Sequence, residues 1–238
     1  EKKYIQDFVV TLYKAYRETI DTVVGEVREI IEDLDPEMWR TMEEILNEKF
    51  DPEYHVYPTM LPMSPYGKDH FNISIMPNVL KNAAVRREVI AHVCVHELSH
   101  LLYLKKLERM LGCTRENLHK AIGVNHRSLD GLKEIYAPII QNNPRMRKFF
   151  PNRVVGNQEF SLIKVEYKEH VMAIEDYFIE RYYDFEKEDL ERDEIDRKML
   201  ELLKDIDAQF SDKLRIYNNT NRTHLIRLGF FNPILIEQ

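Results

Sequence analysis

The pentapeptide His96-Glu97-Leu98-Ser99-His100 constrains this chain more than any other feature. Residues four apart on an α-helix share one face, so His96 and His100 can present both imidazoles to one metal ion. Glu97 stands beside the pair, where a carboxylate can take a proton from water. The pattern therefore predicts a helical metal site with two histidine ligands and Glu97 as general base. The flanking positions are apolar, as in a buried helix: Val93, Val95, Leu98, Leu101 and Leu102.

Composition narrows the class of protein. The 238 residues include only 7 Gly and 10 Pro beside many helix formers, which predicts a mainly α fold. The net charge of -7 argues against a nucleic-acid partner. No apolar run approaches the roughly 18 residues of a membrane span. Two cysteines, Cys94 and Cys113, are too few for a disulfide framework and fit a reducing, cytoplasmic compartment.

Hydrophobic periodicity divides the chain into elements. Alternation at Phe71, Ile73 and Ile75 predicts a strand over 71–76. The signature helix is expected over 83–110, between a capping Asn82 and a terminating Gly112. Further helices are expected over 4–34, 36–46, 114–137 (two or three short ones), 161–185 and 188–210, with irregular stretches over 51–68 and 138–160.

The order of strand 71–76, signature helix and acid-bearing helix 161–185 resembles the zincin metallopeptidases. The resemblance covers about residues 70–185 and implies a zinc cofactor and a peptide or protein substrate, paired along the strand. It also implies an α+β, zincin-like domain over 51–238 with a small sheet beside the signature helix, preceded by an N-terminal helical part over 1–50.

A catalytic zinc needs a third protein ligand. Residues 101–109 contain no histidine, so the chain resembles zincins whose third ligand is a distant acid. Asp176 and Glu180 share one face of the helix expected over 161–185. Glu180 ranks first because Glu180 and Asp184 match a zincin spacing in which the aspartate orients a ligand histidine. Asp176 follows, since segment 174–181 is similar to a run in metallopeptidases associated with von Willebrand-type domains. Three further alternatives remain open: Glu175, His170 and His224.

Other residues leave alternatives open. His92 shares a helix face with His96 and fits either an outer-shell residue or a satisfied core histidine. Candidates for stabilising a tetrahedral oxyanion are Tyr183, Tyr217 and His224. Segment 118–129 superficially resembles a helix-turn-helix, but the acidic chain favours two short helices that cover the active-site cleft.

These features predict a zinc metallopeptidase in which Glu97 passes a proton from water to the leaving amine. The alternative is a non-catalytic interaction or scaffold protein that keeps a structural or vestigial metal site.

Overall fold

The structure is a computed structural model that describes residues 2–51, 53–60, 66–152, 154, 156, 160, 162–167 and 170–227. Side chains are described over these residues except 2–6, 8–9 and 215–227.

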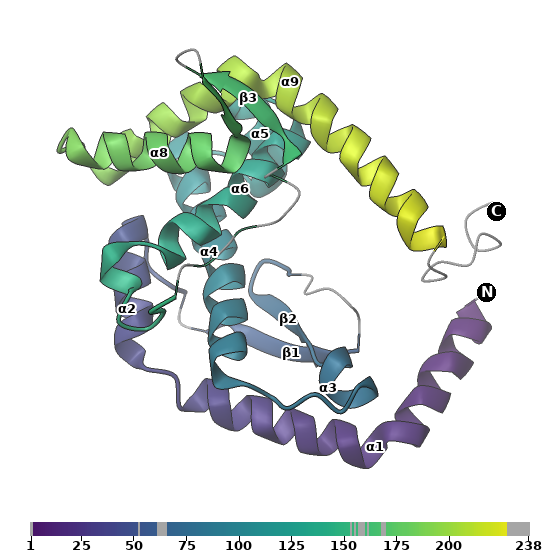
Figure 1. Ribbon diagram of the computed structural model, residues 1–238. Coiled ribbons are helices and arrows are strands. Elements are labelled where there is room, and N and C mark those ends of the chain that lie inside the picture. The colour runs from purple at the N-terminus through teal and green to yellow at the C-terminus, as the bar shows by residue number, and fades with distance from the viewer. Residues whose placement is uncertain are drawn as a thin grey trace. The chain divides into compact units, whose positions relative to one another are not determined.

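The described chain is mainly α-helical with two small two-stranded sheets, which confirms the fold class expected from the sequence (Figure 1). The helices are α1 (Lys2–Glu32), α2 (Pro36–Leu46), α3 (Met76–Leu80), α4 (Arg87–Leu111), α5 (Leu118–Ile122), α6 (His126–Gln141), α8 (Ile174–Lys187) and α9 (Arg192–Arg227). The strands are β1 (His55–Thr59), β2 (His70–Ser74), β3 (Lys164–Tyr167) and β4 (His170–Ala173), and η1 (Arg115–Asn117) and η2 (Pro144–Met146) are short 3-10 turns.

The chain forms two compact units. The first comprises residues 1–102 and 140–152, and the second comprises residues 103–139 and 153–238. The boundaries between the units fall inside α4 and α6, and both helices run through them without a break.

In the first unit, α2 begins and ends where the sequence predicts. Asp35 caps the helix by accepting a hydrogen bond from the backbone N–H of Glu37 at 2.8 Å, and Pro36 occupies the first helical position. Asn47 closes the other end in the left-handed conformation, with φ of 51°. Local capping chemistry therefore explains both bounds.

The sheet of the first unit joins β1 and β2 in parallel, with His55 opposite His70 (Figure 1). Phe71 and Ile73 are buried, as the alternating pattern predicts. Residues 51–68 were expected to be irregular, but residues 55–59 form the strand β1. Pro58 is compatible with this strand because, within the described part of the chain, β1 pairs only with β2, so its other edge needs no backbone donor.

In the second unit, aromatic contacts join four helices. Tyr103 of α4 stacks on Tyr136 of α6 with ring centroids 3.9 Å apart, and Tyr182 of α8 meets the edge of Tyr136 at 6.0 Å. Phe178 of α8 packs on Phe210 of α9 at 6.4 Å. The core of this unit therefore lies among α4, α6, α8 and α9.

The prediction of one helix over 161–185 is wrong in its first half. Residues 164–167 and 170–173 form the antiparallel pair β3–β4, and α8 begins only at Ile174. Val165 is buried between exposed Lys164 and Glu166, a period of two that suits a strand. The signature helix also starts later than expected, at Arg87, and the left-handed Gly112 with φ of 63° follows its last residue.

The segment that resembles a helix-turn-helix does form two helices, α5 and α6, around a left-handed Gly123. Asp207 of α9 accepts a hydrogen bond from the backbone N–H of Asn125 at 2.9 Å, and Ser128 donates to the Asp207 carbonyl at 3.3 Å. α9 thus contacts the N-terminal end of α6, which a groove-binding helix would need to keep accessible.

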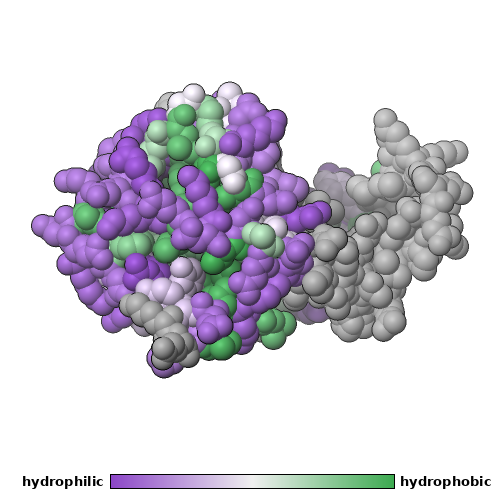
Figure 2. All heavy atoms as spheres, turned by 90° about the horizontal axis from the view of Figure 1, so that it is seen from above, coloured by the Kyte–Doolittle hydropathy of each residue, from purple (hydrophilic) through white to green (hydrophobic). Residues whose placement is uncertain are grey.

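The surface is predominantly hydrophilic on the face that Figure 2 shows, with smaller groups of hydrophobic residues among the charged ones. Among the described residues, no helix combines the length and apolar character that crossing a bilayer requires.

Candidate metal centre

α4 brings the two signature histidines together. The Nε2 atoms of His96 and His100 lie 3.0 Å apart, and their ring centroids are separated by 4.4 Å. His100 is buried and His96 is half-buried. Val95, Leu98, Leu101 and Leu102 are buried around them, so the apolar positions fix the helix in place. The shared helix face expected from the spacing is therefore present.

Glu134 of α6 completes a group of three possible ligands. One ligand atom from each of His96, His100 and Glu134 lies within 4.8 Å of the other two. Among the described residues, no other set of His, Cys, Asp and Glu side chains meets this spacing. Two imidazole nitrogens and a carboxylate oxygen are the donor set of His₂Glu zinc enzymes, so the residues fit a catalytic zinc.

Asp176 and Glu180, the acids nominated from the sequence as third ligand, do not join this group. Both are exposed on α8. Asp176 lies in the first turn of that helix, where a carboxylate favourably meets the positive end of the helix dipole. Asp184, which was expected to orient a histidine, instead pairs with Arg181 at 3.5 Å and Lys187 at 3.2 Å. The helix dipole and surface ion pairs thus account for Asp176 and Asp184.

Two of the remaining candidates for the third ligand, Glu175 and His170, do not belong to the group of three possible ligands either. Glu175 accepts a hydrogen bond from the backbone N–H of Gly156 at 3.1 Å, and His170 is exposed at the start of β4. The side chain of His224 lies outside the described residues.

Sequence reasoning missed Glu134, although the sequence carries a signal for it. Lys133 and Glu134 are the only charged residues between Gly131 and Ile140, in a stretch that is otherwise apolar. In the structure every other residue of that stretch is buried, and Glu134 is half-buried. Charged residues are seldom buried without a partner, so an acid inside such a helix indicates a specific interaction.

Lys133 contributes a positive charge beside Glu134. Its Nζ lies 3.2 Å from Oε1 of Glu134, and its side chain is 7% exposed. Glu97, the expected general base, is also buried. Glu97 and Lys133 are therefore withdrawn from bulk water on α4 and α6, and Glu134 is half-buried beside the lysine.

Cys94 adds no ligand to this site. Burial, reinforced by the negative charge of Glu97, raises the pKa of the Cys94 thiol to about 12. The thiol therefore stays protonated at neutral pH, and the buried structural role expected from its offset fits the structure. Cys94 and Cys113 are both free thiols.

An aromatic side chain packs against one of the histidines. The ring of Tyr66 lies 5.6 Å from that of His100, tilted by 44°. Tyr66 also pairs with Phe71 through an isolated antiparallel bridge, which ties it to β2. Of the oxyanion candidates from the sequence, Tyr183 donates its hydroxyl to the carbonyl of Ile139 at 3.3 Å. The side chains of Tyr217 and His224 lie outside the described residues.

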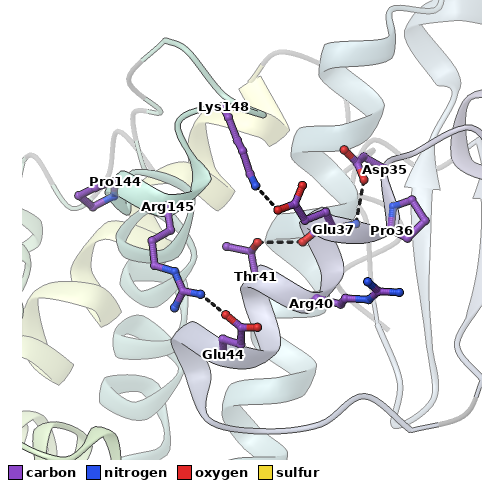
Figure 3. A pocket seen from close by; sticks show the side chains of 9 residues that line it. All are labelled: Asp35, Pro36, Glu37, Arg40, Thr41, Glu44, Pro144, Arg145 and Lys148. Atoms are coloured by element: carbon purple, nitrogen blue, oxygen red, sulfur yellow. Dashed lines mark hydrogen bonds and ion pairs between the residues drawn. The ribbon is translucent and has the colours of Figure 1, made fainter.

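A separate hollow of about 910 Å³ opens at the start of α2 (Figure 3). Its charges largely pair with one another: Lys148 with Glu37 at 2.5 Å, and Arg145 with Glu44. All four of these side chains are about half exposed. None of the three grouped residues His96, His100 and Glu134 lines this hollow.

Comparison of the chain with protein-family models, with curated proteins and with solved structures finds no match. The function is therefore inferred from the residues of the site.

Proposed function

We propose that the protein is a zinc-dependent peptide hydrolase whose metal is held by His96, His100 and Glu134. The observation that carries the proposal is the approach of these three ligand atoms to within 4.8 Å of one another. A structural zinc is closed by four protein ligands, whereas a catalytic zinc keeps one position open. Among the described residues no fourth ligand of this kind joins the group, which favours catalysis over a structural site.

In this proposal, zinc supplies a Lewis acid that acidifies water and polarises a carbonyl group. Glu97 follows His96 directly on α4 and is buried, and we assign its carboxylate the role of general base. It accepts a proton from the attacking water as the water oxygen bonds to the carbonyl carbon. It then delivers that proton to the amine nitrogen as the carbon–nitrogen bond breaks. One water is consumed, a carboxylic acid and an amine are released, and no electrons are exchanged.

The choice of a peptide substrate rests on the resemblance to the zincins. Support comes from the bridge of Tyr66 to Phe71 and the packing of Tyr66 on His100, which link β2 to the signature helix. In this proposal an extended peptide pairs along β2 beyond the Tyr66–Phe71 bridge. The two free thiols support a reducing, cytoplasmic setting.

Metal analysis tests the ligand assignment. We expect one zinc per wild-type chain and none after His96→Ala/His100→Ala. Glu134→Gln should weaken zinc binding by at least about 100-fold, because even outer-shell partners of a zinc contribute 10–100-fold. Glu180→Gln and Asp176→Asn are matched controls on α8 and should retain the metal. Full zinc in Glu134→Gln, with loss in either control, would return the third ligand to α8.

Substitution of Glu97 tests the chemistry. Glu97→Gln keeps the shape of the side chain but cannot accept a proton, so zinc should remain while hydrolysis falls by roughly 10²-fold or more. Cleavage is followed by mass spectrometry on a mixture of unlabelled peptides. If zinc-loaded wild type cleaves no peptide bond above the level of Glu97→Gln, the protein is a non-catalytic metal-binding scaffold instead.

A further inference from the structure

Lys133 has a position that its helix alone does not explain. Neighbouring residues on an α-helix do not face each other, yet Nζ of Lys133 lies 3.2 Å from the carboxylate of Glu134. The two side chains converge although their backbone positions diverge by about 100° around the helix axis. With 7% of its side chain exposed, the lysine is also nearly withdrawn from solvent.

We infer that Lys133 stabilises negative charge on an oxygen at the open position of the metal site, so that the site prefers anionic oxygen ligands. This inference rests on the proposed function, because it takes Glu134 as a ligand. A carboxylate ligand lies about 2 Å from its zinc. The ammonium group of Lys133, 3.2 Å from one oxygen of Glu134, would therefore lie close to a metal held by that carboxylate.

The balance of charges gives Lys133 a distinct role. Zinc contributes two positive charges, Glu134 and Glu97 contribute one negative charge each, and Lys133 adds one positive charge. Without the lysine the group is neutral, and with it the group is positive before any anion forms. This excess positive charge stabilises a neutral carbonyl group only slightly. It directly stabilises the tetrahedral anion that follows water attack. Burial keeps solvent from screening the attraction.

The same charge has an opposite effect on the metal. An ammonium group near zinc repels the cation, so Lys133 weakens metal binding while it strengthens anion binding. A residue that only held α6 in place would affect the two in the same direction. Opposite changes in zinc affinity and anion affinity are therefore the signature of an electrostatic role.

Lys133→Met tests the inference, with Lys133→Arg as the variant that keeps the charge. Lys120→Met, at an exposed position of α5, is the control for a change in net charge. Zinc affinity is measured by competition with a chromophoric chelator. Anion affinity is measured by calorimetric titration of the zinc-loaded proteins with acetohydroxamate, a small anion that binds zinc through oxygen.

Lys133→Met should bind zinc up to roughly 10-fold more tightly and acetohydroxamate roughly 10-fold more weakly. Lys133→Arg and Lys120→Met should stay within about twofold of wild type in both titrations. Lys133→Gln must repeat the result for Lys133→Met, which separates loss of charge from faulty packing of the thioether. Unchanged acetohydroxamate affinity in zinc-loaded Lys133→Met and Lys133→Gln, or a parallel loss of both affinities, overturns the inference.

The outcomes also separate this inference from the proposed function. If wild type binds no zinc, or if Glu97→Gln leaves hydrolysis unchanged, the proposed function fails regardless of Lys133. If zinc and hydrolysis behave as proposed but anion affinity does not respond to the lysine charge, only the inference fails.

Discussion

His92 and His96 lie one turn apart on α4, yet their surroundings give them different chemistry. His96 faces the imidazole of His100, whereas His92 stacks on Phe150 with ring centroids 4.3 Å apart. Gln141 donates a hydrogen bond to the backbone carbonyl of His92 at 2.9 Å. Burial lowers the pKa of His92, and the charge of Glu88 opposes this only in part. His92 is therefore a half-buried ring that is neutral at neutral pH.

The lowered pKa of His92 predicts a loss of stability in acid. An unfolded histidine titrates near pH 6.5. Because the folded pKa lies below that value, protons bind more tightly to the unfolded chain. The contribution of neutral His92 to the free energy of unfolding is thus fully present above pH 6.5. It is lost as the pH falls through the folded pKa. Thermal unfolding with chelator present should show a steeper fall in Tm from pH 7 to pH 5 for wild type than for His92→Gln. Parallel curves would contradict the prediction.

At the scale of elements, the second unit is held by a buried polar network between α4, α6 and α9. Lys106 of α4 is 1% exposed and forms ion pairs with Asp196 and, at 3.3 Å, with Asp193. Tyr136 of α6 donates its hydroxyl to Asp196 at 2.5 Å. Burial raises the pKa of Asp196, and the charge of Lys106 opposes that shift. Each member of the network therefore depends on its partners to remain buried.

Removing one partner of this network should be more harmful than removing two. Lys106→Met leaves Asp196 buried without its cation, and we expect it to lower the free energy of unfolding by about 3–5 kcal/mol. Lys106→Met/Asp196→Asn has no unpaired charge and should recover a clear part of that loss. Urea unfolding of both variants measures the difference. A double variant no more stable than Lys106→Met would show that the ion pair is not what the lysine contributes.

Elements governed by local chemistry could be predicted from the sequence. Asp35-Pro36 set the start of α2, and Gly112 follows the end of α4. The spacing of His96 and His100 fixed their shared face for the same reason. Glu134 could not be nominated in this way, because it belongs to another helix, α6, and no repeat along one helix relates it to the histidines. The strand β3 was missed because Val165 and its neighbours fit both periods over so short a segment.

For the whole molecule, the proposed ligands belong to separate helices, α4 and α6. A metal that binds the folded chain and not the unfolded one stabilises the fold by mass action. At a free zinc concentration 1,000 times the dissociation constant, the gain is about 4.1 kcal/mol. Metal content and folding are therefore linked if the proposed site is correct.

Removing the metal should lower the melting temperature. For a chain of this size, about 1 kcal/mol shifts Tm by roughly 2–4 °C, so a strong chelator should lower it by about 8–16 °C. The double variant His96→Ala/His100→Ala should melt at one temperature with or without chelator. Calorimetry of the two proteins checks this, and an equal response to chelator in both would point to metal bound elsewhere.

The continuity of α4 also bears on how this chain can vary in length. His96, His100 and Lys106 belong to one unbroken helix, so each residue inserted between them turns one group by about 100° relative to the other. A single insertion near Tyr103 would misalign either the histidine pair or the ammonium group that meets Asp196. We therefore expect residues 96–106 to accept substitutions but not insertions or deletions. In a library of one-residue insertions, the variants that fold should carry no insertion within this stretch.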